Sequence, residues 1–143
     1  MRRNIAASLL LLIVGACGGP TFNENDVQID CEATHPKVGY TAELETHQHD
    51  VSGTVHVIDD CTLEIRNFHF DGGGVDVRVI GSTDTDFENG YTLSENLLRD
   101  AYSGETLTVS LPNGVTLDDF EHLSVWCTAA GVSFGDGQLE ATP

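Results

Sequence analysis

Residues 122–139 read HLSVWCTAAGVSFGDGQL, which is an alternating run, a turn of small residues and a second alternating run. Leu123, Val125 and Cys127 occupy every second position, so the pleat of an extended chain places all three on one face. The small residues that follow allow a tight turn before the alternation resumes towards Phe134. The stretch therefore predicts a β-hairpin whose Cys127 thiol points into a core.

Short alternating runs separated by turn residues continue this pattern from about residue 39 to the end of the chain. The positions expected to face the core are Val55, Val57, Cys61, Leu63, Ile65, Phe68, Phe70, Val75, Val77, Val79, Leu107, Val109 and Leu111. Phe68 and Phe70 fall on the opposite parity from Ile65, and a β-bulge near Asn67 would return both sets to one face. Only residues 94–99 and 117–121 have the composition of a helical turn. We therefore expect an all-β fold, an antiparallel β-sandwich of short strands with little helix.

Length and charge limit the range of functions. A chain of 143 residues with 40% hydrophobic residues can bury one core, which predicts a single folded domain. The formal net charge of -17 repels the phosphate backbone, so nucleic acid is excluded as a partner. The sequence contains no phosphate-binding loop, haem-attachment motif or nucleophile elbow, so it predicts no catalytic residue and favours a protein that is not an enzyme.

The first residues have the pattern of a bacterial lipoprotein signal. A basic start, MRR, precedes the apolar run 5–14, and small residues lead directly to Cys17. The run is too short to span a bilayer but fits the apolar region of a secretory signal. We expect a signal peptide over residues 1–16 and a lipid group on Cys17, which would anchor the protein to the membrane. The alternative is an ordinary secretory signal in which Cys17 is incidental.

The segment after Cys17 predicts how the domain is attached. Residues 17–38 are polar, start with glycines and proline and lack periodicity, so they are expected to form a lipid-attached flexible tether. Residues 39–143 are expected to form the β-sandwich domain. Such a protein is exported and lipid-anchored to the bacterial cell envelope. Gly18, rather than Asp, after the cysteine favours the outer membrane if the source is Gram-negative.

His47 and His49 form a candidate metal pair. Two residues apart on an extended segment, they lie on one face, and paired imidazoles bind transition metals. No third and fourth ligands can be identified from spacing, so hydrogen-bonded or solvated histidines are the competing interpretation.

The cysteines allow two disulfide pairings. Cys61 and Cys127 both share parity with core residues, and an exported protein meets an oxidising compartment, so we expect them to pair and Cys31 to stay free. The rival is a Cys31–Cys61 bond, which would leave Cys127 as a lone thiol. A thiol in buried apolar surroundings is poorly reactive, so Cys127 can equally be structural.

Five blocks in order carry a family resemblance. They are HDVSGTV at 49–55, NFHFDG at 67–72, LPNG at 111–114, LSVWC at 123–127 and VSFG at 132–135. Together they resemble the DM-thirteen domain family, an electron-transfer module that occurs beside DOMON domains. The resemblance implies that Cys127 is a redox thiol or a ligand to a prosthetic group, with haem or copper as cofactors and a redox or cell-surface protein as partner. Val75 stands where the family often has proline, and Cys61 adds a second core-facing thiol.

Two functions follow from the sequence. The first is a lipid-anchored cell-envelope protein acting as a redox or electron-transfer accessory module through Cys127. The second is a non-enzymatic β-sandwich binding or adhesion module whose cysteines are purely structural. If Cys61 and Cys127 were paired, the isolated domain would be colourless and would lack oxidoreductase turnover.

Overall fold

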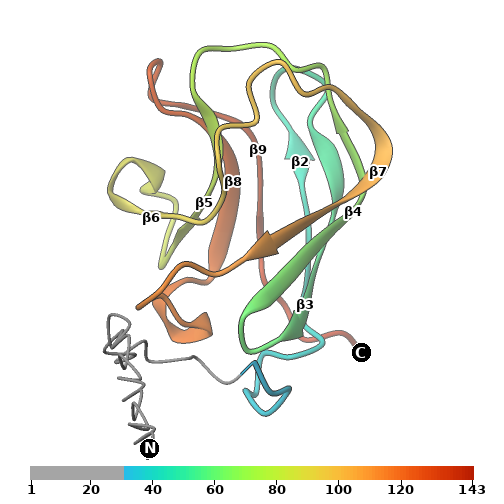
Figure 1. Cartoon of the computed structure of the whole chain (residues 1–143), viewed down its shortest axis with the longest axis vertical. Helices are drawn as coiled ribbons and strands as arrows, with labels where there is room; N and C mark the ends of the chain where they lie inside the picture. Colours follow the sequence, from blue (N-terminus) through green and yellow to red (C-terminus); the bar gives the residue numbers. More distant parts are fainter. Residues whose placement is uncertain (1–30) are drawn as a thin grey trace, which may run out of the picture.

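Two antiparallel sheets face each other in the computed structural model, which describes residues 31–143 (Figure 1). The first sheet has the order β1-β3-β4-β7 and is built from β1 (Thr41–Glu43), β3 (Ser52–Asp59), β4 (Thr62–Phe70) and β7 (Tyr102–Ser110). The second has the order β2-β9-β8-β5-β6 and is built from β2 (Glu45–Thr46), β5 (Val77–Ser82), β6 (Tyr91–Thr92), β8 (His122–Cys127) and β9 (Val132–Gln138). Two short 3-10 helices, η1 (Phe87–Asn89) and η2 (Leu117–Asp119), are the helical elements of this region. The predicted all-β sandwich is confirmed.

The signal peptide, Cys17 and the first part of the predicted tether lie outside the described residues. Within residues 31–143, no helix is both long and apolar enough to span a membrane.

The predicted hairpin forms β8 and β9, and its apolar face lies in the core between the sheets. Val125 is 0% exposed and Phe134 is 2% exposed. The β-bulge predicted near Asn67 is also present, because the pairing of β4 with β7 shifts between Ile65 and Phe68, and Asn67 has a φ of 50°. The bulge brings Phe68 to 0% exposure, and burying such a side chain contributes roughly 1.5–3 kcal/mol.

Two local expectations were wrong. Val75 is 64% exposed, because Asp76 has a φ of 71° and the strand begins only at Val77. Residues 94–99 form no helix and run beside β5, where Asn96 Oδ1 accepts from Val77 N–H at 3.0 Å. The edge of β5 therefore holds the first part of this segment, and the last part forms a turn in which Asp100 N–H donates to Leu97 O at 3.1 Å.

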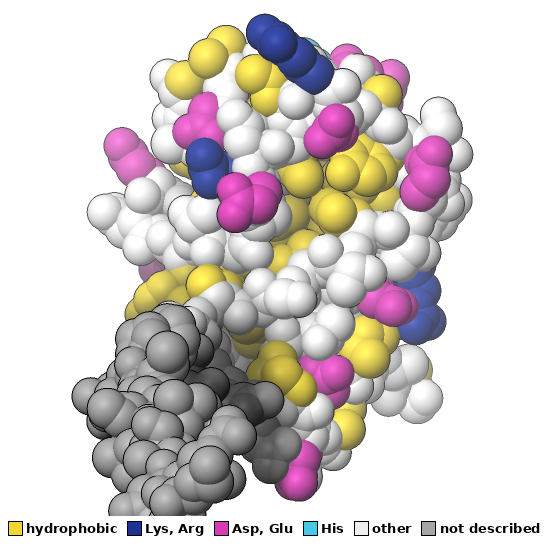
Figure 2. All heavy atoms as spheres, in the orientation of Figure 1, with side chains coloured by type: hydrophobic (Ala, Val, Ile, Leu, Met, Phe, Trp, Pro, Cys, Tyr) yellow, Lys and Arg dark blue, Asp and Glu magenta, His cyan; other side chains and the backbone are white. Residues whose placement is uncertain are grey.

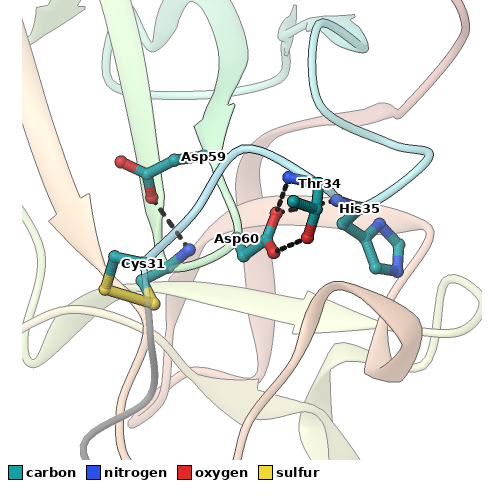
Figure 3. Close-up of a disulfide and its surroundings, with 6 residues drawn as sticks. Cys31, Thr34, His35, Asp59 and Asp60 are labelled. Carbon is teal, nitrogen blue, oxygen red and sulfur yellow. Dashed lines mark hydrogen bonds between the residues drawn. A yellow bond between two sulfur atoms is a disulfide. The ribbon is translucent and has the colours of Figure 1, made fainter.

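The disulfide prediction is corrected by the structure. Cys31 pairs with Cys61, with 5.2 Å between their Cα atoms, and Cys127 is the free cysteine of residues 31–143 (Figure 3). Parity placed both Cys61 and Cys127 in the interior, and both are buried. However, Cys61 lies in the β3–β4 turn, whereas Cys127 ends β8, and these points are at opposite ends of the sandwich (Figure 1). The alternation of side chains shows which residues face the core, but it does not show at which end of the sandwich each of them lies.

The last residues of the predicted tether are fastened to the domain. The Asp60 carboxylate accepts hydrogen bonds from Thr34 N–H at 3.0 Å, Thr34 Oγ1–H at 2.8 Å and His35 N–H at 2.9 Å (Figure 3). Lys37 Nζ donates to Leu117 O at 2.7 Å and lies 2.8 Å from Glu121 Oε1. The described chain therefore enters at the end of the sandwich that holds the β3–β4 turn, and we call this the tether end (Figure 1).

Candidate functional site

The loops at the opposite end of the sandwich surround the candidate redox residue. We call this the loop end and define it as residues 47–51, 71–76, 97–101 and 128–131 (Figure 1). Backbone hydrogen bonds tie these loops together: Asp71 N–H donates to His49 O at 3.1 Å, and Arg99 N–H donates to Gly72 O at 3.0 Å. The loops are thus a connected unit.

Cys127 lies at the base of this unit. It is the last residue of β8, opposite Val77 of β5 and Val132 of β9, and it is 2% exposed. The turn after it is fixed by Gly131 N–H, which donates to Cys127 O at 2.9 Å, and by Thr128 N–H, which donates to Asp76 O at 2.9 Å. The thiol is therefore held within an apolar layer under ordered loops.

Unusual backbone conformations gather at the loop end. Among the described residues, four of the five non-glycine residues with positive φ lie there: His49 (56°), Asp50 (56°), Asp76 (71°) and Arg99 (73°). Such conformations are unfavourable for residues with a Cβ and persist where surrounding contacts hold them, which is a frequent feature of binding sites.

A histidine-carboxylate pair is the polar centre of these loops. His49 Nδ1 lies 3.0 Å from both carboxylate oxygens of Asp71, and Gly73 N–H donates to Asp71 Oδ1 at 2.7 Å. The Gly73 N–H and the His49 imidazole hold the pKa of the Asp71 carboxyl below its ordinary value, against the effect of burial. The His49 ring lies on the Phe134 ring with 4.2 Å between centroids. Phe134 therefore covers one face of the His49 ring, and Asp71 holds its Nδ1.

The glycines after Asp71 make this arrangement sterically possible. A Cβ on Gly73 would lie 2.6 Å from His49 Nδ1, and a Cβ on Gly74 would lie 2.7 Å from Val77 Cγ2 and 2.9 Å from Phe134 Cε2. The loop thus lies directly on His49, Phe134 and the residue opposite Cys127.

Gly73→Ala is expected to separate His49 from Asp71, because the added methyl group has no room beside the imidazole. We expect a loss of about 1–3 kcal/mol in the free energy of unfolding, measured by urea unfolding. Because the Asp71 carboxyl then loses the His49 imidazole, its lowered pKa is expected to rise towards the ordinary value, which NMR measures. Gly114→Ala is the control for an added methyl group without a steric clash: its φ of 85° disfavours alanine, but its Cβ would have nothing within 4 Å, so the pair of His49 and Asp71 should stay intact. An unchanged pKa of the Asp71 carboxyl in Gly73→Ala would contradict the prediction.

The candidate metal pair is split between two carboxylates. His47 Nε2 lies 2.9 Å from Asp136 Oδ2, which also accepts from Ser133 Oγ–H at 2.7 Å, and the Ser133 hydroxyl lies 2.8 Å from the Ser124 hydroxyl. His49 instead uses Asp71. The two imidazoles are therefore bound in separate hydrogen-bonded groups, as in the competing interpretation.

The donors around Cys127 do not fit a copper or haem centre. Within residues 31–143, one group of three potential ligands has its donor atoms within 4.8 Å of one another: Cys31, Asp59 and Cys61, two of which form the disulfide. A copper site of the electron-transfer type needs imidazoles beside the thiolate, whereas the residues opposite Cys127 are valines. At 2% exposure the sulfur also has no free side for a haem iron.

The comparison with known proteins agrees with the sequence blocks. The family model described as Electron transfer DM13 matches residues 43–139. The chain belongs to the DM13 family. Over 138 residues, 94% of the chain, it is 28% identical to the cytochrome b561, DM13 and DOMON domain-containing protein of Arabidopsis thaliana. Over 110 residues, 70% of the chain, it is 34% identical to isoforms B/C of the protein Skeletor of Drosophila melanogaster.

This DM13 chain covers only a small part of those relatives. The match spans 14% of the Arabidopsis protein and 13% of Skeletor isoforms B/C. No solved structure matches the chain.

Sequence reasoning missed several polar residues of the site. Asp71 and Gly73 follow the block NFHFDG, but only the fold shows that they close on His49, which is 22 positions from Asp71. The Ser124, Ser133 and Asp136 group lies on facing strands of one hairpin. Its signal in the sequence was Ser124 between two apolar residues, whereas Ser133 and Asp136 are three positions apart and come together through the register shift between β8 and β9.

Proposed function

We propose that this protein is a lipid-anchored electron-transfer accessory module of the cell envelope, in which Cys127 is the redox-active residue. The observation that carries the proposal is the free Cys127 thiol: because Cys61 pairs with Cys31, the cysteine at the end of the hairpin remains reduced among the described cysteines. Membership of the family described as Electron transfer DM13 supports a redox role for this thiol.

The arrangement of the cysteines implies that a partner completes the redox reaction. Cys31 and Cys61 are joined at the tether end, and Cys17 is the proposed lipidation site, so no second thiol of the chain is placed to pair with Cys127. The electron acceptor or donor is therefore a group on a separate redox protein. Since Cys127 is 2% exposed, the loops above it must move before that group can reach the sulfur.

The two ends of the sandwich suit attachment to a membrane. A lipid on Cys17 would tether the chain from the side on which Cys31 enters the fold, and the loop end points the other way (Figure 1). In this orientation the loops and Cys127 face away from the bilayer and towards a partner. The net charge of -17 also repels the domain from anionic lipid.

The redox role is tested by incubating the native full-length protein with oxidised glutathione, which stands in for the partner's disulfide, with Cys127→Ser as the variant. We expect the Cys127 thiolate to displace one glutathione and form a mixed disulfide that dithiothreitol reverses, a product absent in Cys127→Ser and retained in His56→Gln, a change on the other sheet. A native wild type that gains no glutathione, or a Cys127→Ser protein that gains as much as the wild type, would exclude Cys127 as the redox residue.

A non-enzymatic binding module is the second candidate. It is favoured by the burial of Cys127 among core side chains and by the absence of metal-ligating neighbours in the described region. In this case the thiol reacts only after unfolding, and Cys127→Ser leaves every native property except stability unchanged.

The lipid anchor gives a separate prediction. Cys17→Ser is expected to move the protein from the detergent phase to the aqueous phase, because the acyl chains contribute about 0.8 kcal/mol per buried methylene group. Phase partition and intact-protein mass measure this. A wild-type protein without acyl mass would contradict it, and Cys127→Ser, which leaves Cys17 in place, is the control.

A further inference from the structure

A groove opens where the two sheets separate along β7. Its volume is about 620 Å³, within the range of ligand-binding clefts. It is lined by residues of β5, β7 and the segment between β6 and β7, among them Arg78, Leu93, Leu97, Tyr102, Leu107 and Val109. Figure 2 shows the hydrophobic hollow at the centre of this face.

The strand beside the groove has a free edge. β7 is the last strand of its sheet and pairs only with β4. Within residues 31–143, no further hydrogen bond between two backbone groups involves residues 102–110. From Thr106 to Ser110 the strand contains no lysine or proline, the residues that usually block an exposed edge. An extended chain can therefore add to this edge while placing alternate side chains in the groove.

The groove is negatively charged. Arg78 Nε donates to Asp76 Oδ1 at 2.7 Å, so the one basic side chain of the lining is neutralised. Glu95 and Asp100 of the lining have no basic partner among the described ion pairs. Burial, Asp100 and Glu105 raise the pKa of the Tyr102 phenol, as expected for a site of negative potential. Figure 2 shows acidic side chains around the hollow.

We propose that this groove binds an extended polypeptide segment of a partner protein, one with alternating basic and apolar residues, by addition to the edge of β7. The apolar side chains enter between Leu97 and Leu107. The basic ones point to the opposite face of the added strand, where the negative potential of the domain, including the exposed Glu95 and Asp100, attracts them. A second copy of this chain is a poor occupant, because two molecules of charge -17 repel each other. This docking does not depend on Cys127.

The test measures anisotropy of a labelled peptide of alternating lysine and valine, titrated with the full-length protein in neutral detergent. A matched peptide of alternating glutamate and valine is the charge control. We expect saturable binding of the lysine peptide only, with an affinity that falls as salt rises. Equal binding of both peptides, no saturation, or occupation of the edge by a second copy of the protein in size-exclusion chromatography would overturn the proposal.

Variants on one strand locate the site. Leu107→Lys places a charge on the groove wall and is expected to weaken binding by more than about tenfold. Thr106→Lys makes the same charge change at an exposed position of the same edge but outside the groove, so it should weaken binding by edge protection alone, about threefold and clearly less than Leu107→Lys. Glu95→Gln with Asp100→Asn should weaken it about fivefold and reduce the salt dependence. Equal effects of Leu107→Lys and Thr106→Lys would refute the site.

Cys127→Ser separates docking from the proposed redox function. The docking proposal predicts unchanged peptide binding in this variant, and the redox proposal predicts that the mixed disulfide with glutathione is lost. Peptide binding lost together with the mixed disulfide would refute docking at β7.

Discussion

Removing the Cys31–Cys61 disulfide is expected to lower the free energy of unfolding by roughly 3–4 kcal/mol. The bond closes a sequence separation of 30 and so restricts the unfolded chain. It also fixes the entering segment, in which Thr34 and His35 bind the Asp60 carboxylate. Urea unfolding of the Cys31→Ala/Cys61→Ala double variant, compared with the wild type at neutral pH, measures the loss.

Cys127→Ala is the control for this experiment, because it removes a buried sulfur without breaking the disulfide. Its loss should be smaller and should not change under reducing conditions. Non-reducing peptide mapping gives a second readout: a fragment joining Cys61 to Cys127 would contradict the structure, as would a double variant as stable as the wild type.

The β-sandwich could be predicted because its signals are local. The alternation of Leu123, Val125 and Cys127 specifies both a strand and its buried face. The parity change at Asn67 likewise specifies a bulge, since only an extra residue returns Phe68 to the core. Signals of this kind depend on a few neighbouring positions, so they are the same whatever the order of the strands in the sheets.

The disulfide depended on information that the sequence does not contain locally. Cys61 and Cys127 both point inward, but Cys61 precedes the first residue of β4 and Cys127 is the last of β8, and the two lie on different sheets. The position of each residue between the two ends of the sandwich depends on the register of all the strands. Cys31 was assigned to a tether, and the contacts made by residues 32–37 with the folded domain bring it to Cys61.

The loop end was hardest to predict, because its geometry depends on backbone conformations that side-chain patterns do not encode. His49 and Asp50 adopt positive φ, which turns His49 away from the face it would share with His47 on an extended strand. Aspartate tolerates a positive φ better than most residues, which explains why aspartate occupies positions 50 and 76. His49 precedes β3 and Asp71 follows β4, and these antiparallel strands bring the two residues together only because their lengths match.

Phe134→Ala is expected to have the largest effect of any single substitution at the loop end, a loss of about 3–5 kcal/mol in the free energy of unfolding. Phe134 is 2% exposed, and its ring lies 4.2 Å from the His49 ring and 6.4 Å from the Phe70 ring between centroids. Truncation leaves a cavity under the glycine loop and removes the surface on which His49 lies. Urea unfolding measures the loss, and the imidazole resonances of His49 report the change in the loops.

Two controls separate packing from a general sensitivity to aromatic deletion. Phe134→Leu keeps most of the volume, so its loss should be well under half that of Phe134→Ala, about 1–2 kcal/mol. Tyr91→Ala deletes an aromatic ring that is 43% exposed and should stay within about 0.5 kcal/mol of the wild type. If Phe134→Ala unfolds at the same urea concentration as Tyr91→Ala, Phe134 does not join the core to the loop end, and the His49 and Asp71 pair must be held by the loop backbone alone.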